Sequence, residues 1–101
     1  MSKLYELRLT LSRLEEAISR LRTRLYELEE AKRFLESSRE ARKVFRVFGD
    51  RVMIEIGFED AKRFLSDELE ATRLQLERLE KEYKEKLREL QELEKRLHLR
   101  Y

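Results

Sequence analysis

Residues 43–56 read KVFRVFGDRVMIEI, and this stretch decides the fold. Its apolar side chains follow a period of two on both sides of Gly49-Asp50, a dipeptide typical of a two-residue hairpin turn with glycine first. The stretch therefore predicts a β-hairpin over residues 43–57. With this turn, Val47 lies opposite Val52 and Phe45 lies opposite Ile54.

One face of the predicted hairpin is apolar and is the candidate oligomerisation surface. Its residues are Phe45, Val47, Val52, Ile54 and Ile56. The reverse face carries both apolar and charged side chains. A lone two-stranded hairpin is marginal in water, and this one would expose apolar faces and two unpaired edges. We therefore expect it to pair with hairpins of other subunits.

Leucine-rich heptads flank the hairpin on both sides. On the N-terminal side, counted from Leu4 as position a, the apolar a and d positions are Leu4, Leu7, Leu11, Leu14, Ile18, Leu21, Leu25, Leu28 and Leu35. On the C-terminal side, the a and d positions include Leu65, Leu69, Leu76, Leu79, Tyr83, Leu90, Leu93 and Leu97. Such spacing predicts coiled-coil helices over residues 1–38 and 59–99. Thr72 and Lys86 are polar residues at d positions of the C-terminal helix and weaken its apolar seam, the row of a and d side chains. The neighbouring Leu74 and Leu87 are expected to cover these two positions in part.

The two heptad frames stay in register if the chain folds back at the hairpin. In that arrangement Leu35 meets Leu65, and Leu7 meets Leu93. We therefore predict an intramolecular antiparallel coiled coil. The expected fold class is mainly α, an antiparallel two-helix coiled coil with a central β-hairpin through which the chain oligomerises, and residues 1–101 form one domain.

Composition narrows the range of functions. The 24 Lys and Arg nearly balance the 22 Asp and Glu, which favours ion-paired helix faces over a nucleic-acid patch. There is no cysteine, which excludes disulfides and thiolate chemistry. The bias toward Glu, Lys and Arg, without Asn, Cys, Trp or Pro, resembles that of heat-adapted proteins. The N-terminus lacks the apolar run of a signal peptide or membrane span, so we expect a cytoplasmic protein with no membrane partner.

No residue pattern predicts a catalytic, cofactor or metal site. Gly49 and Gly57 are the only glycines, so a Gly-rich phosphate loop is excluded. The single histidine, His98, has no second ligand at helical spacing, and we interpret it as a solvated terminal residue. The serines lack a Gly-flanked elbow and a usable base. We therefore predict that the chain is not an enzyme.

Apolar residues at the two chain ends form the second candidate site. They are Leu4, Tyr5, Leu7, Leu97, Leu99 and Tyr101. Two interpretations stay open. Either these residues close the last layer of the seam, or they form a flexible apolar grip on non-native chains, because coiled-coil ends fray and several weak contacts add up.

The pentapeptide AKRFL occurs twice, at residues 31–35 and 61–65. Two copies do not make a repeat protein. The favoured interpretation is that both helix roots pack an aromatic side chain against the sheet platform that the hairpins of several subunits form. The alternative is a recognition epitope that the chain displays twice.

A helix, one hairpin with a Gly-Asp turn and a returning helix resemble the layout of prefoldin subunits, and residues 43–56 look like the hairpin of the β-type subunit. The α-type subunit has two hairpins. The resemblance implies an ATP-independent chaperone, a hexamer of two α-type and four β-type subunits whose hairpins build a double β-barrel platform. Six arms would hold unfolded proteins at their tips and deliver them to a group II chaperonin, in archaea or the eukaryotic cytosol.

Carried onto this sequence, the resemblance makes the five apolar hairpin residues platform residues and the six end residues tip residues. The first helix here is rich in Arg and Glu, whereas first helices of the family are often Gln-rich. The expected partners are an α-type subunit, further copies of this chain, unfolded proteins and the chaperonin. A structural scaffold without chaperone activity is the alternative, and nucleic-acid binding is a third hypothesis that interleaved acidic residues disfavour.

Overall fold

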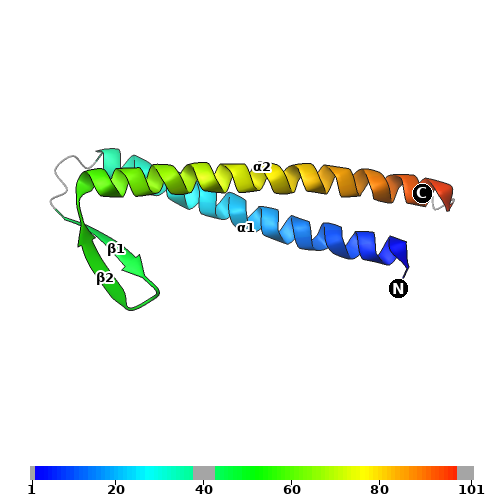
Figure 1. Ribbon diagram of the computed structural model, residues 1–101, viewed down its shortest axis with the longest axis horizontal. Helices are drawn as coiled ribbons and strands as arrows, with labels where there is room; N and C mark the ends of the chain where they lie inside the picture. The colour runs from blue at the N-terminus through cyan, green and yellow to red at the C-terminus, as the bar shows by residue number, and fades with distance from the viewer. Residues whose placement is uncertain (1, 38–42, 98–101) are drawn as a thin grey trace. The chain divides into compact units, whose positions relative to one another are not determined.

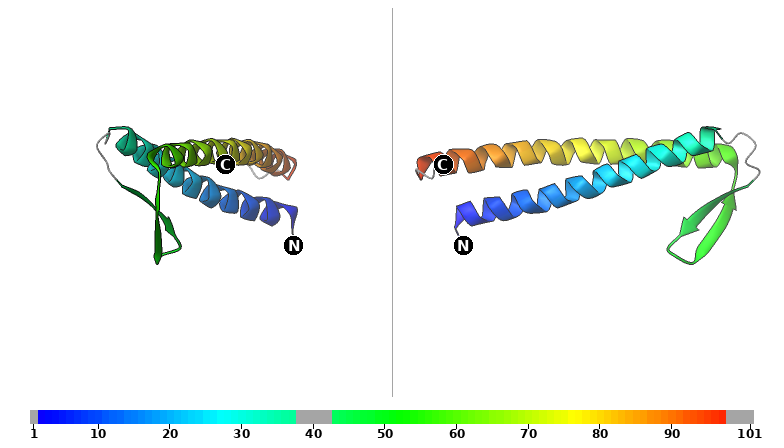
Figure 2. Two further views of the ribbon diagram at one scale, coloured as in Figure 1. Left: turned by 60° about the vertical axis from the view of Figure 1, so that its left-hand side comes forward. Right: turned by 180° about the vertical axis from the view of Figure 1, so that it is seen from behind.

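A computed structural model describes residues 2–37 and 43–97 of the chain. Helix α1 spans Lys3–Ser37, strand β1 Val44–Phe48, strand β2 Val52–Ile56 and helix α2 Phe58–Arg96 (Figure 1). Figure 2 shows the same succession of elements from two further sides. The fold is mainly helical, with two long helices flanking an antiparallel two-stranded hairpin, as the sequence predicts. Helix α2 begins one residue before the predicted range of 59–99.

Polar side chains occur at the start of both helices. The backbone N–H of Tyr5 donates to Oγ of Ser2 at 3.2 Å, so Ser2 is the N-cap of α1. At the start of α2, Glu59 and Asp60 occupy the first turn, where the helix dipole favours negative charge. The sequence therefore specifies both helix starts through side chains that satisfy or complement free amide groups.

The a and d positions of both helices form the core. Ten of these residues expose 9% or less of their surface, namely Leu7, Leu11, Leu14, Ile18, Leu28, Leu35, Leu69, Thr72, Leu76 and Leu90. The predicted heptad frame is therefore confirmed on both sides of the hairpin. Leu74, which was expected to cover Thr72 in part, is 60% exposed, so that expectation is wrong.

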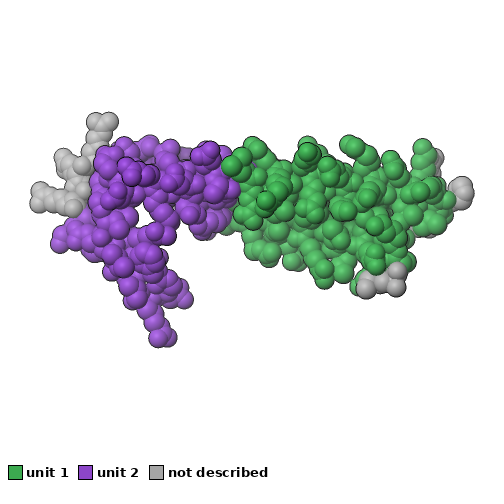
Figure 3. Space-filling model, viewed as in Figure 1, with its two compact units in different colours: residues 1–23, 74–101 green, residues 24–73 purple. Residues whose placement is uncertain are grey.

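The contacts divide the chain into two compact units (Figure 3). Residues 1–23 and 74–101 make up the first, which we call the free-end unit because it holds both chain ends. Residues 24–73 make up the second, which we call the hairpin unit. Each unit contains a segment of α1 that runs antiparallel to a segment of α2.

An apolar cluster and polar contacts across the helices stabilise the free-end unit. Leu7, Leu11 and Leu90 form the cluster, and four partly buried side chains pack against it, Leu4, Tyr83, Leu87 and Leu93. The contacts that join α1 to α2 are Arg8 to Glu94 at 3.5 Å, Arg22 to Glu80 at 2.8 Å, and the hydroxyl of Tyr83 to Glu15 at 2.8 Å. These pairs have the antiparallel register that the heptads predict.

The hairpin has a different register from the one predicted. Phe48 pairs with Val52, whereas the sequence placed Val47 opposite Val52. The connection between the strands has three residues, 49–51, rather than two, and Gly49 adopts a positive φ of 58°, which glycine tolerates best. Because side chains alternate between the faces of a strand, this shift of one residue moves every β2 side chain to the other face relative to β1.

Candidate functional sites on the hairpin and at the free helix ends

The observed register distributes the candidate oligomerisation residues over both faces of the hairpin. One face carries Val44, Arg46, Phe48, Val52, Ile54 and Ile56. The other face carries Phe45, Val47, Met53 and Glu55. Phe45 therefore lies opposite Glu55 rather than Ile54. The prediction that the five candidate residues share one face is wrong, because Phe45 and Val47 lie on the face opposite to the other three.

Both hairpin faces expose large apolar side chains. Between 42% and 63% of the surface is exposed for Phe45, Val47, Phe48, Val52, Met53 and Ile54. Within the described ranges, β1 and β2 pair only with each other, so the outer edge of each strand keeps unpaired amide and carbonyl groups. Apolar faces beside free edges are the features by which one strand adds to the sheet of another chain.

Arg46 connects the hairpin to the first turns of α2. Its guanidinium carbon lies 4.0 Å from the ring centroid of Phe64 on α2 and 4.7 Å from that of Phe48 on its own strand. Both distances fall within the range of cation–π contacts. No carboxylate in the part of the chain that the structure describes forms a salt bridge with Arg46. Sequence reasoning assigned Arg46 no role, because only the fold brings Phe64 to it.

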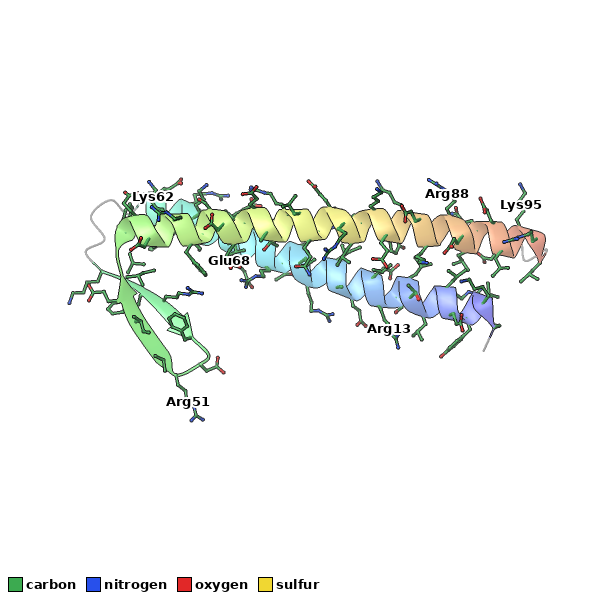
Figure 4. The ribbon with its side chains drawn as sticks, viewed as in Figure 1. Arg13, Arg51, Lys62, Glu68, Arg88 and Lys95 are labelled. Carbon is green, nitrogen blue, oxygen red and sulfur yellow. The ribbon has the colours of Figure 1, made fainter. Side chains whose placement is uncertain are left out.

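The hairpin unit contains a groove of about 650 Å³. Its apolar lining consists of Leu28, Ala31, Phe34, Leu35, Val44, Phe45, Val47, Ile56, Ala61, Phe64 and Leu65. Arg24, Lys43 and Arg46 complete the lining. Arg24 already forms a 2.9 Å ion pair with Glu68, which Figure 4 labels on α2. The groove is therefore an apolar surface with cations around it.

Both copies of the repeated pentapeptide contribute to this groove, but their aromatic residues differ. Phe64 is half-buried and lies against Arg46 of the hairpin. Phe34 is 72% exposed. Within the single chain, one of the two aromatic residues, Phe64, therefore packs against the hairpin. That Phe34 packs against the sheet formed by several hairpins stays a prediction.

The candidate tip residues at the free helix ends differ in how far they are buried. Leu7 is 3% exposed and belongs to the core cluster, against which Leu4 packs. Tyr5 and Leu97 are 55% and 52% exposed. The structure thus places Leu4 and Leu7 together in the last layers of the seam and leaves Tyr5 and Leu97 open to solvent. Three predictions at the C-terminal end lie outside the described residues, those for His98, Leu99 and Tyr101.

The sequence model of the prefoldin subunit family matches residues 1–100 of the chain. The chain belongs to the prefoldin subunit family. A comparison with curated proteins finds no match. Prefoldin is a non-enzymatic chaperone family whose subunits assemble with one another and act on client proteins, so membership indicates a chaperone-like subunit function.

Tyr83 is a half-buried ionisable residue of this prefoldin-family chain. Tyr83 donates a hydrogen bond to Glu15, and this bond, partial burial and the nearby carboxylate charge raise the pKa of the Tyr83 phenol above its ordinary value.

Among residues 2–37 and 43–97, no cluster of three or more potential ligands is placed to hold a metal ion. No helix within these ranges is long and apolar enough to cross a membrane.

Proposed function

We propose that this chain is a β-type prefoldin subunit that acts as an ATP-independent holdase. The observation that carries the proposal is the hairpin, which exposes six large apolar side chains beside two free edges. A strand pair of this kind is marginal when alone in water, so its composition favours burial in an assembly. Residues 2–37 and 43–97 contain one hairpin between two helices, which supports the β-type rather than the α-type assignment.

The proposed assembly is a hexamer of two α-type and four β-type subunits. Hairpins of an α-type subunit and of further copies of this chain add to the free edges and build a double β-barrel platform. Phe45 and Val47 from one face, and Val52, Ile54 and Ile56 from the other, become buried in it. Residues 1–101 act in the assembly as one prefoldin-like domain.

The proposed client-binding residues come from the two ends of the sequence and comprise Leu4, Tyr5, Leu7, Leu97, Leu99 and Tyr101. Tyr5 and Leu97 are exposed already and are available for the first contacts. Leu4 and Leu7 contribute when the end layers open, because coiled-coil ends fray. Several arms acting together give useful affinity from weak individual contacts.

Delivery of clients to a group II chaperonin completes the proposed activity, in the cytoplasm of an archaeal cell. The abundance of Glu, Lys and Arg together with the absence of Asn, Cys, Trp and Pro supports a heat-adapted source.

Light scattering from a chemically denatured client, diluted into this chain with and without an α-type subunit, tests the proposal. The full chain should suppress aggregation, and a chain trimmed to residues 8–94 should not. Because trimming also removes Leu4 and Leu7, the sharper variant is Tyr5→Ser with Leu97→Ser, which keeps the core. The matched control is Tyr26→Ser with Leu74→Ser, two residues that are 65% and 60% exposed away from the ends. No suppression by the full chain in either mixture would contradict the holdase function.

A scaffolding coiled coil without chaperone activity is the second candidate. Burial of Leu7 at 3% exposed and the 3.5 Å ion pair of Arg8 with Glu94 favour it, because both close the layers near the free ends. A scaffold predicts assembly through the hairpin with no suppression of aggregation. The same light-scattering experiment therefore separates the two candidates.

A further inference from the structure

The apolar seam of the free-end unit does not by itself select one register of the two helices. Every a and d position of α1 from Leu4 to Leu21 is leucine or isoleucine. A slip of α1 along α2 by one heptad, about 10 Å, therefore still places such a residue opposite each a and d position of α2 that α1 covers. Even the polar Lys86, at a d position, meets a leucine whether its neighbour is Leu7, Leu14 or Leu21.

The polar contacts beside the seam do depend on the register. Successive e positions of α1 in this unit alternate in charge and are Arg8, Glu15 and Arg22. The e positions of α2 in this unit are Glu80, Leu87 and Glu94. Arg8 pairs with Glu94 at 3.5 Å, and Arg22 pairs with Glu80 at 2.8 Å. Glu15 lies between the two arginines in the sequence and accepts the 2.8 Å hydrogen bond of the Tyr83 hydroxyl.

A slip by one heptad in either direction removes these contacts. In one direction Glu15 comes to face Glu80, and in the other it comes to face Glu94. Like charges that face each other repel. In both slips one arginine faces the uncharged Leu87, and the Tyr83 hydroxyl faces an arginine instead of a carboxylate. Among these three registers, only the observed one gives each charged e residue of α1 in this unit a complementary partner.

We propose that these polar residues determine the specificity of helix pairing by selecting one register. We call them the register code, which consists of Arg8, Glu15, Arg22, Glu80, Tyr83 and Glu94. Each of their contacts is weak because it is exposed to solvent. The leucines contribute similarly to every register, so weak contacts are enough to decide between registers, as charged flanking positions do in coiled coils. The inference concerns pairing within the chain and does not rest on the proposed holdase function.

The register also determines how much apolar surface the C-terminal part of α2 exposes. In the observed register, Leu93 is partly buried and packs against the cluster of Leu7, Leu11 and Leu90. A slip that brought Glu15 opposite Glu80 would leave Leu93 beyond the first residue of α1. The register code therefore keeps this layer of the seam closed.

Exchanging the charges of Glu15 and Arg22 tests the register code without changing the composition, the net charge or the seam. In the variant Glu15→Arg with Arg22→Glu, two glutamates face each other in the observed register, whereas the slipped register brings the introduced arginine opposite Glu80. The ratio of slipped to unslipped molecules should rise by about ten- to a hundredfold. The matched control is Glu16→Arg with Arg20→Glu, which exchanges two exposed charges of the same helix outside the code and should leave the register unchanged.

Spin labels on Ser19→Cys and Gln91→Cys report the register, because the chain has no cysteine of its own and both positions are exposed. Labelled chains are diluted into unlabelled ones, so that pulsed dipolar spectroscopy measures the distance within one chain. The natural chain and the control should give a single distance. The exchanged variant should add a second distance that is longer by up to about 10 Å, the length of one heptad.

A third substitution separates a change of register from general damage to the fold. Adding Glu80→Arg to the exchanged variant restores opposite charges in the observed register, so the longer distance should disappear. An exchanged variant that gives only the natural distance, or a longer distance that persists after Glu80→Arg is added, would overturn the proposal. Neither result involves a client protein, so failure of the holdase function is a separate outcome.

Discussion

The free-end unit and the hairpin unit place their apolar residues in opposite ways. In the free-end unit, Leu7, Leu11 and Leu90 lie between the helices and expose 9% or less of their surface. In the hairpin, six apolar side chains expose 42% or more. The difference teaches that one chain completes its helical core alone but has no partner of its own for its strands.

Backbone hydrogen bonding explains this difference. A helix satisfies its amide and carbonyl groups internally except at its ends, so two helices need only bury their apolar stripes against each other. A two-stranded sheet always leaves two edges unpaired. The helices of the free-end unit therefore need no partner for their backbone groups, whereas the hairpin is the element that a partner completes in the proposed assembly.

The largest effect is expected from a charge on the hairpin. Val47→Asp should weaken association about a hundredfold or more, because a buried unpaired carboxylate is costly. Native mass spectrometry measures the outcome. Leu74→Asp is the matched control, since Leu74 is 60% exposed and Val47 is 57% exposed, and it should leave the mass unchanged. An unchanged mass for Val47→Asp would contradict the claim that the hairpin, unlike the helical core, needs a partner chain.

A core truncation should damage the free-end unit next most strongly. Leu11→Ala removes a side chain that is 6% exposed, and the free energy of unfolding should fall by about 2–4 kcal/mol. Denaturant titration measures this change. The neighbouring Ser12→Ala is exposed and should shift stability by less than about 0.5 kcal/mol. A loss of similar size in both variants would contradict a packed core at Leu11.

The ion pairs across the helices should contribute less than the core. Arg22 and Glu80 are 2.8 Å apart, but their side chains are 63% and 38% exposed. A double-mutant cycle with Arg22→Gln and Glu80→Gln should give a coupling of about 0.2–1 kcal/mol that falls as salt is added. A larger coupling that is insensitive to salt would show that these charges, rather than the leucines, stabilise this unit.

The smallest effect is confined to alkaline pH. The hydrogen bond to Glu15, together with partial burial and the carboxylate charge, raises the pKa of Tyr83 above its unfolded value. Its stabilisation is therefore fully present below the unfolded pKa and is lost as the pH rises through the folded pKa. The difference in unfolding free energy between the natural chain and Tyr83→Phe should shrink over that alkaline range. A difference that stays constant across it would exclude this hydrogen bond as its source.

The helices could be predicted from the sequence because successive heptads place apolar side chains on the same face of each helix. Leu7, Leu11 and Leu90 are buried as that spacing requires. The hairpin register could not be predicted, because apolar side chains occur at both odd and even positions of the strands, and the turn length alone selects the pairing. Gly49 marked the turn correctly but did not reveal its three-residue length.

The candidate sites could be predicted only in part, for a related reason. The repeated pentapeptide indicated that Phe34 and Phe64 matter together, but only the fold shows Phe64 against Arg46 and Phe34 in solvent. Of the two interpretations of the chain ends, the exposure of Tyr5 and Leu97 fits an apolar grip, and the burial of Leu7 fits a closed seam. Contacts between residues distant in sequence decide these outcomes, and no local pattern encodes them.

Hydrogen exchange measured by mass spectrometry at two protein concentrations tests the contrast between the units most directly. The account predicts that amides of residues 44–56 exchange more slowly at the higher concentration, because partners then cover the free strand edges. Amides of residues 3–23 should exchange at the same rate at both concentrations. Hairpin exchange that is independent of concentration, alone and with an α-type subunit present, would contradict the claim that another chain completes the hairpin.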